Sequence, residues 1–506
     1  MTSAEYPIPS HLLSSNVPPL DAESICFRKL LVDIAARIDV LNAQIATMGV
    51  ETTAEQSVER DALAARADQY QTVLSPARRL PPELVCEIMT QVPCTREIGG
   101  PEPVAQTPWR LGHICRSWRS WVLEYPRLWC SFHIPYRFHH ASDDFPPAMV
   151  ETQLVRAGDL PLSISFDWVV GKSVLENSPL DLLVPLSERW QSLHIQCRDH
   201  DDLECLVEVL RPIAGRLPNL ERLEFLFDSE PEDSDIFEPE WDIFFSAPRL
   251  REAFLTDSLT GYYSLKFPIP WSQITRYRAL FTAANTHLGI FQKTPNLVDC
   301  TIGVDEQTNL ELTVTLACLR RLCVECSGGI LANITAPSLE HLLVTEMTPA
   351  AAPFVHRSSC RLKTLVITQI SFIDNLIPLL EASPSLETFI LSGVVLTDIP
   401  KTATLFAALQ VSGSNSDICP NLAFLAFGMQ VSPDVSWKEV LFQMIRSRYF
   451  AGRLRTVRLF KNIVPFGSAF VEEMNADIGR LESEGLDIKY LAGDEAGDKL
   501  IDEFRP

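Results

Sequence analysis

The feature that most constrains the fold is a pattern that returns throughout the second two-thirds of the chain. Each occurrence reads Leu-x-x-Φ-x-Φ, where Φ is apolar and Trp can stand in the first place. In six occurrences a Pro lies two places before the Leu. Because Pro ends a helix, the pattern predicts a helix, a turn and then a short strand. The ten occurrences start at Trp190, Leu220, Leu250, Leu297, Leu319, Leu339, Leu362, Leu386, Leu422 and Leu454.

A single helix–strand unit cannot bury its own apolar face, so repeated units stack on one another. The sequence therefore predicts an α/β fold with a repeat domain over residues 150–491. Spacings between the starts vary from 20 to 47 residues, so we expect units of unequal length. A helix over residues 470–481 and a last strand over residues 486–490 would cap the stack, and residues 492–506 read as a loose acidic tail.

In each predicted strand the Φ side chains point into the core, and the residue between them points to the opposite, concave face. Along the domain these intervening residues change from polar to apolar and end in a cation. An exposed apolar stripe with a polar rim is typical of a partner site. The alternative is that another segment covers this stripe, since parallel strands are often apolar on both faces. The candidate target-binding residues are Cys323, Leu343, Val366, Ile390, Ala426 and Arg458.

Arg458 also belongs to a local excess of positive charge. Residues 446–461 hold six cations and no acid, in a chain whose formal net charge is −22. Such a cluster fits an acidic or phosphorylated target segment. The alternative is an end strand whose cations are solvated.

Upstream of the repeats, residues 1–22 are rich in Pro and Ser, which predicts disorder. Apolar residues then recur alternately four and three apart over residues 27–48, which is a heptad seam. Gly49 ends the seam, and an Ala-rich helix follows over residues 53–74. We expect a helical hairpin, a short coiled coil, over residues 23–78. Its seam either closes within the hairpin as a brace or mediates self-association through residues 27–48.

Residues 79–132 carry three short motifs in a fixed order. Pro82 fits the first turn of a helix, and Glu83 suits the positive end of its dipole. Apolar spacings of three, four and three predict a second helix from Leu111 to Trp121. An insertion over residues 93–108 separates the two helices. The motifs are Leu80-Pro81-Pro82-Glu83-Leu84, Ile114-Cys115-Arg116-Ser117-Trp118-Arg119 and Pro126-Arg127-Leu128-Trp129.

The three motifs resemble an F-box, a helical module that docks on a Skp-family adaptor of cullin ubiquitin ligases. The repeats resemble an irregular leucine-rich-repeat solenoid, and the whole order resembles the large F-box families of mushroom-forming fungi. The resemblance implies a three-helix F-box and a substrate-recognition subunit that binds an unknown target protein. The alternative, which the insertion favours, is a leucine-rich-repeat scaffold whose F-box is structural or vestigial. By resemblance the adaptor-binding residues are Leu80, Pro81, Leu84, Val85, Ile88, Ile114, Trp118, Leu128 and Trp129.

Composition sets limits on the function. The net charge argues against a nucleic-acid or anionic-membrane partner. The 13 Cys follow no disulfide framework, and neither a leader nor an apolar run long enough to span a bilayer is seen, so we expect a cytoplasmic or nuclear protein with reduced thiols. Cys323 and Cys326 form a lone C-x-x-C without the second pair that zinc needs. With no catalytic motif in the chain, we expect no enzyme activity, no metal and no cofactor.

Overall fold

The computed structural model describes residues 7–47, 53–90, 107–135, 147–168, 180–197, 206–227, 242–257, 268–304, 312–326, 328–369, 373–394, 399–411, 417–429, 436–461, 468–491, 496–502 and 504. The chain divides into two compact units. The first combines Met1–Ile134 with Pro146–Leu162, and the second combines Pro135–Phe145 with Ser163–Pro506. Within the described ranges, no helix is both long and apolar enough to cross a membrane.

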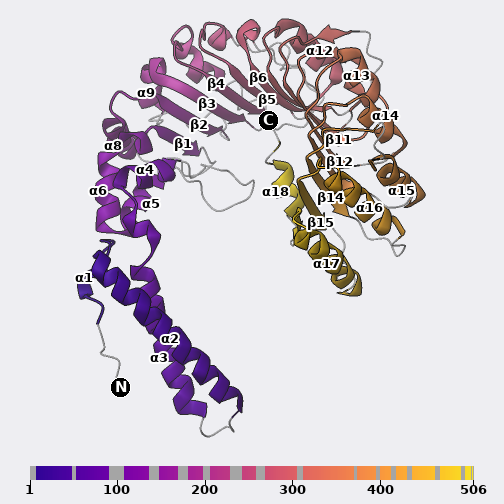
Figure 1. Cartoon of the computed structure of the whole chain (residues 1–506). Coiled ribbons are helices and arrows are strands. Elements are labelled where there is room, and N and C mark those ends of the chain that lie inside the picture. The colour runs from indigo at the N-terminus through magenta and orange to yellow at the C-terminus, as the bar shows by residue number, and fades with distance from the viewer. Residues whose placement is uncertain are drawn as a thin grey trace. The chain divides into compact units, whose positions relative to one another are not determined.

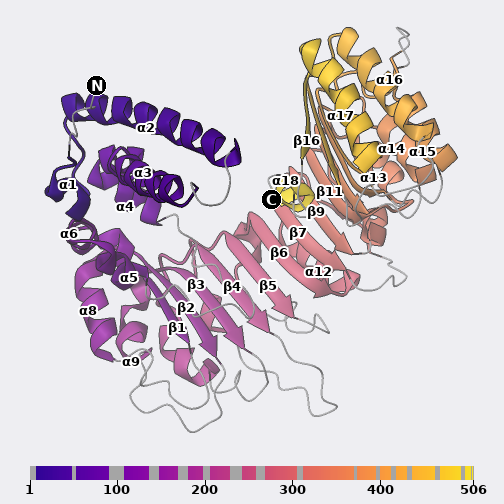
Figure 2. The same cartoon turned by 90° about the horizontal axis from the view of Figure 1, so that it is seen from below.

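The first unit begins with the predicted helical hairpin. Helices α2 (Asp21–Thr47) and α3 (Thr53–Val73) lie side by side (Figures 1 and 2). Phe27 and Leu41 of the seam are fully buried, and the rings of Phe27 and Tyr70 lie 5.4 Å apart. Because the seam packs against α3, the structure favours the brace interpretation. Self-association through residues 27–48 stays a prediction.

The expectation of disorder over residues 1–22 is wrong for the described part of that stretch. Residues Ser10–Ser14 form α1, and Leu12 is buried in the same cluster as Phe27 and Tyr70. Arg78 donates a hydrogen bond of 2.6 Å to the carbonyl oxygen of Leu12. Burial of Leu12 and the hydrogen bond to its carbonyl hold this stretch in place, although its composition is polar. Residues 1–6 lie outside the described residues.

Three short helices follow in the first unit. They are α4 (Pro82–Thr90), α5 (Thr107–Ile114) and α6 (Arg116–Glu124), flanked by the 3-10 turns η1 (Pro76–Arg79) and η3 (Pro126–Trp129). The predicted continuous helix from Leu111 to Trp121 is wrong, because it breaks at Cys115. That residue has extended backbone dihedrals and caps α6, its sulfur accepting a hydrogen bond from the backbone N–H of Trp118. Most of the predicted insertion, residues 93–106, lies outside the described residues.

Trp129 is buried between the helices of this unit. Its indole N–H donates 2.7 Å to the carbonyl of Val122, and its ring meets that of Trp109 edge to face at 5.0 Å. Helix α8 (Pro147–Ala157) adds Gln153, whose amide donates to the carbonyl of Trp129. Arg156 stacks on both tryptophan rings. Helix α8 therefore belongs to the first unit, although the sequence assigned residues from 150 onward to the repeats. The unit also holds strand β1 (Ser131–Pro135).

The second unit is a large parallel sheet. From β2 onward the spatial order of its strands follows the chain, and every pairing from β3 to β16 is parallel. A separate pair, β8 (Val314–Thr315) with β10 (Ile334–Thr335), lies outside that order. From β2 onward, the strands of the large sheet are β2 (Leu162–Trp168), β3 (Trp190–Cys197), β4 (Arg222–Phe227), β5 (Glu252–Asp257), β6 (Arg276–Thr282), β7 (Asp299–Val304), β9 (Arg321–Cys326), β11 (His341–Glu346), β12 (Thr364–Gln369), β13 (Thr388–Val394), β14 (Phe424–Met429), β15 (Thr456–Lys461) and β16 (Asp487–Leu491).

Short helices connect the strands, and those from α12 to α15 line the outer side of the sheet in Figure 1. Because each parallel crossover brings its helix to this side, the apolar face of each unit is covered there. The connections contain α9 (Leu180–Leu183), η4 (Val184–Arg189), η5 (Arg211–Ile213), η6 (Asp242–Phe244), η7 (Trp271–Gln273), α12 (Ala284–Lys293), η8 (Gly328–Asn333), α13 (Ala351–Ser358), η9 (Ile373–Asn375), α14 (Leu376–Glu381), α15 (Ile399–Ala408), α16 (Ser436–Phe450) and α17 (Ser468–Ser483).

The predicted starts agree with this sheet. The first residue of each of the ten segments is buried, at 2% exposure or less. The predicted α/β class, the helix over residues 470–481 and the last strand are confirmed, the latter two as α17 and β16. Among the described strands, five were not predicted: β1 and β2 before the first segment, the short pair β8 and β10, and, between two predicted strands, β6. Ile274 replaces Leu at its start and Ala279 fills a Φ position, so the longest predicted spacing contains two units.

Candidate functional site

Helix α4 exposes a row of apolar side chains. Leu84 and Ile88 lie one helical turn apart and are 53% and 56% exposed, and Leu80 precedes them at 37%. The opposite face of α4 buries Val85, Cys86 and Met89. We call Leu80, Leu84 and Ile88 the α4 apolar row. Pro81 is exposed beside the row, and Ile114, at the end of α5, is 58% exposed.

Three other candidate adaptor-binding residues are packed inside the unit. Val85, Leu128 and Trp129 are 7%, 8% and 1% exposed. Their side chains hold the helices together and present no surface to a partner. Trp118 is half-buried. The candidate adaptor-binding residues are therefore of two kinds. Some are buried in the core of this unit, and the others are exposed on its surface.

A polar tie that the sequence did not reveal joins α4 to the turn after α6. The phenol of Tyr125 donates 2.8 Å to a carboxylate oxygen of Glu87. This hydrogen bond raises the pKa of Tyr125 above its ordinary value, because the phenolate could not donate it. Arg127 lies 3.8 Å from the same carboxylate. The tie fixes the last turn of α4 and with it the direction of Ile88.

On the second unit, the predicted concave residues form one row across the sheet. The strand pairings place them directly opposite one another, with Arg278 of the unpredicted β6 inserted in the row and Lys489 at its end. In order, the row reads His194, Glu224, Phe254, Arg278, Thr301, Cys323, Leu343, Val366, Ile390, Ala426, Arg458 and Lys489.

The apolar part of this row is not exposed, which corrects the expectation of an open stripe. The five candidate residues are at most 3% exposed and share one core cluster with Phe460 and Ile501. The cover is helix α18 (Ala496–Asp502), which lies on the inner side of the sheet (Figure 1). The expectation of a loose acidic tail over residues 492–506 is therefore wrong for the part that forms α18. The apolar stripe consists of Cys323, Leu343, Val366, Ile390 and Ala426.

Helix α18 approaches the sheet closely at a glycine. A Cβ built on Gly497 would lie 2.6 Å from a ring carbon of Phe460, and a Cβ on Gly428 would lie 2.5 Å from the same ring. Phe460 is thus held between two backbones that only Gly allows to come so near. Further along, the rings of Phe504 and Phe424 lie 6.0 Å apart.

Arg458 is committed to a partner within the chain. Its guanidinium donates to both carboxylate oxygens of Asp487, at 3.0 and 2.8 Å. These hydrogen bonds lower the pKa of Asp487. Other cations of residues 446–461 are also engaged. Arg448 is fully buried on backbone carbonyls, and Arg453 lies 3.1 Å from Asp417. Ion pairing and backbone capping within the chain thus occupy much of the charge expected to face a target.

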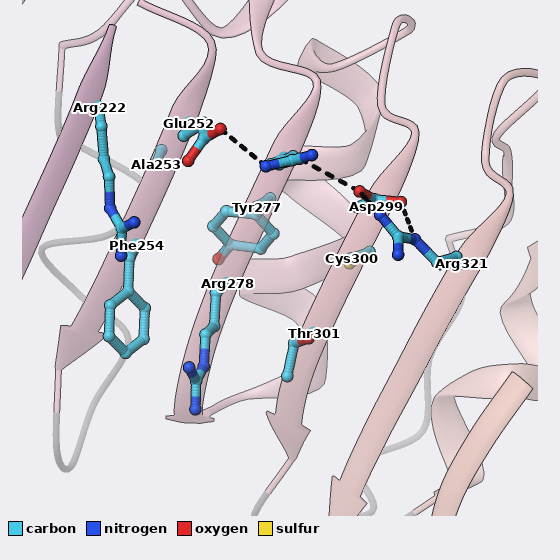
Figure 3. A pocket seen from close by; sticks show the side chains of 11 residues that line it. Arg222, Glu252, Ala253, Phe254, Tyr277, Arg278, Asp299, Cys300, Thr301 and Arg321 are labelled. Carbon is cyan, nitrogen blue, oxygen red and sulfur yellow. Dashed lines mark hydrogen bonds and ion pairs between the residues drawn. The ribbon is translucent and has the colours of Figure 1, made fainter. Parts of the chain in front are cut away.

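A polar pocket that the sequence did not predict lies on β4 to β9, with a volume of about 230 Å³. Its arginines and carboxylates alternate from one strand to the next across the sheet (Figure 3). Arg276 bridges Glu252 and Asp299 at 2.9 and 3.2 Å, and Arg321 forms a bidentate pair with Asp299. The pocket was missed because Arg276 and Arg278 belong to the unpredicted β6.

The remaining charges of this region are only partly neutralised. Arg278 is exposed and stacks on Phe254, 4.7 Å from the ring centroid. Glu224 accepts from His194 at 3.2 Å. Burial alone would raise the pKa of Glu224, but the hydrogen bond to His194 and the nearby cations lower it overall. The pocket can therefore hold a carboxylate or another anion against Arg278.

Within the described residues, no group of three His, Cys, Asp or Glu side chains could hold a metal ion. Cys323 is buried in the apolar stripe, whereas Cys326 is exposed at the end of its strand. Comparison of the chain with protein-family models gives no match, and comparison with curated proteins gives none either.

Proposed function

We propose that this chain is a non-catalytic substrate-recognition subunit of a cullin-type ubiquitin ligase. An F-box over residues 79–132 docks on a Skp-family adaptor, and through it on a cullin. An irregular leucine-rich-repeat domain holds a target protein. Its contribution to the reaction is proximity, because it brings a target to an enzyme that another subunit supplies.

The exposed α4 apolar row carries this proposal. A helix on the surface of a folded unit ordinarily presents polar residues to water. Helix α4 instead places apolar residues on both faces, and Leu84 and Ile88 are each more than half exposed. Burying one such side chain stabilises a complex by roughly 1.5–3 kcal/mol. A partner that covers the row would therefore gain several kcal/mol.

The second unit supports the other half of the proposal. Its sheet is covered by helices on one side and offers the concave row on the other. Part of that face carries the polar pocket on β4 to β9, and part is apolar and lies beneath α18. A long face with two chemically distinct regions suits the binding of an extended protein segment.

The test is the affinity of the full-length chain for a Skp-family adaptor. The Leu84→Ala, Ile88→Ala double variant should lose roughly 100-fold or more in affinity, since two apolar contacts are removed. The matched control is Val155→Ala on α8, because Val155 is 82% exposed in the same unit and lies outside the α4 apolar row. The control should bind as the wild type does.

Two outcomes would count against the proposal. Unchanged binding by the double variant would show that the α4 apolar row is not the docking surface. If a folded wild-type chain does not bind the adaptor at all, the proposed function itself fails. Circular dichroism and thermal unfolding of each variant would establish that the loss is not a loss of fold.

A further inference from the structure

Helix α18 resembles a bound peptide more than a core element. It has seven residues, and a helix of that length is not stable in water by itself. Its side chains divide by environment. Ile501 is buried, Leu500 is partly buried, and Lys499 and Asp502 are exposed; Phe504, in the turn after the helix, is partly buried as well. The apolar residues at i, i+1 and i+4 form one face, and that face lies on the apolar stripe.

The sheet does not depend on α18 for its construction. Helix α18 follows β16, so its release would break no strand pairing. The strands that carry the stripe are held by continuous parallel ladders, and helices cover their other face. Release would instead uncover five apolar side chains in one row. A surface of that kind requires another apolar cover.

The charges around the stripe indicate what that cover carries. Residues 494–503 hold five acidic side chains and one lysine. At the far end of the stripe the row continues with Arg458 and Lys489, which lie opposite each other on β15 and β16. Arg458 is already paired with Asp487, so Lys489 leaves this edge with a net positive charge, and the acidic stretch that contains α18 lies beside it, which favours acidic over basic partners.

We propose that the apolar stripe is a docking groove for a short acidic amphipathic helix of a partner protein, and that α18 occupies the groove until such a helix displaces it. The partner helix would carry apolar residues at i, i+1 and i+4, as Leu500, Ile501 and Phe504 are spaced. Identifying this partner with the ligase target rests on the proposed function. The apolar character of the groove does not depend on the proposed function.

The structure provides a variant that opens the groove. In Gly497→Ala, the added methyl would lie 2.6 Å from the Phe460 ring, which cannot retreat because Gly428 lies against it. The matched control is Gly479→Ala on α17, where an added Cβ meets nothing within 4 Å. Both changes replace a helical Gly by Ala, but only Gly497→Ala brings the added methyl against Phe460.

The probe is a fluorescein-labelled peptide of residues 494–506 with the wild-type sequence, titrated into the full-length chains. Gly497→Ala should bind it at least tenfold more tightly than the wild type or Gly479→Ala, whose own α18 competes. A peptide carrying Ile501→Asp should bind none of them. Hydrogen exchange should show faster exchange of the α18 amides in Gly497→Ala alone.

Equal peptide affinity of the three chains would overturn the proposal, whether or not the α18 amides of Gly497→Ala exchange faster. Doubling of the mass of Gly497→Ala in light scattering, without peptide, would also overturn it by making a second copy the occupant. Affinity for the adaptor should be the same in all three chains. That measurement separates failure of the groove from failure of the proposed function.

Discussion

The two halves of the concave row stabilise the inner face of the sheet in different ways. Strands β3 to β7 present His194, Glu224, Phe254, Arg278 and Thr301, and most of these side chains remain in contact with water. Strands β9 to β14 present the apolar stripe, where exposure is at most 3%. Both halves belong to one parallel sheet, and the strand pairings carry the concave row through both of them.

The difference shows that a repeat sheet needs a cover on its inner side only where its sequence makes that side apolar. In the charged half, arginines and carboxylates neutralise one another across neighbouring strands, as Arg276 does between Glu252 and Asp299. In the apolar half no such pairing is possible, and the chain returns with α18 to exclude water. Ion pairs thus stabilise the inner face in one half, and burial of apolar side chains stabilises it in the other.

The largest effect should come from introducing a charge into the apolar half. Val366→Asp would bury a carboxylate without a partner beneath α18, which we expect to cost about 4 kcal/mol or more. Phe254→Asp places the same carboxylate in the same row of the charged half, near Arg278, and should cost less than about 1.5 kcal/mol. Urea unfolding of both variants measures the difference. Similar losses would refute the contrast between the halves.

The core behind the charged half should make stability sensitive to pH. His287 on α12 is fully buried, with its ring nitrogens 3.4 Å from the Tyr277 hydroxyl and 3.2 Å from the Gly303 carbonyl. Burial lowers its pKa from 6.5 to about 4. The unfolded chain therefore binds a proton that the folded chain refuses, and stability is lost as the pH falls from 6.5 to 4. The loss amounts to roughly 3 kcal/mol.

Urea unfolding midpoints at pH 7 and pH 4.5 measure this loss. The variant His287→Gln keeps polar atoms in place but cannot titrate, so its stability should fall less over the same interval. Carboxylates with lowered pKa values, such as those of Glu224 and Asp487, contribute equally in both chains and cancel in the comparison. An equal fall for the wild type and the variant would contradict the assignment to His287.

The sequence predicted the repeating part of this fold because its signal is local. A Leu that begins each segment, followed by alternating Φ positions, is enough to place a strand and its inward side chains. This is why the ten starts are all buried. The concave row followed from the same alternation, and the strand pairings place its members opposite one another. The candidate residues could therefore be named, but their exposure could not.

Features that depend on distant residues escaped prediction. Whether the apolar stripe is open depends on α18, which lies more than a hundred residues after most of the stripe. The spacing of Leu500, Ile501 and Phe504 was the available signal, and the acidic residues around it concealed it. The break at Cys115 was hidden because apolar spacing continues across it. Strand β6 was hidden because Ile and Ala replaced Leu and a larger Φ residue.

The smallest effects should distinguish two ion pairs, one at the end of the charged half and one on β15 and β16, beyond the apolar half. Arg321 and Arg458 both form bidentate pairs, but the Asp299 side chain is 9% exposed and that of Asp487 is 48% exposed. Arg321→Ala should cost about 1–2 kcal/mol, because it leaves a nearly buried carboxylate with Arg276 alone. Arg458→Ala should cost about 0.5 kcal/mol, as expected for an exposed pair. Added salt at about 1 M should abolish the second loss and spare most of the first, since screening acts on exposed charges. If salt abolished both losses, burial of the Asp299 carboxylate would add nothing to its ion pair. The two halves would then differ only in their residue composition.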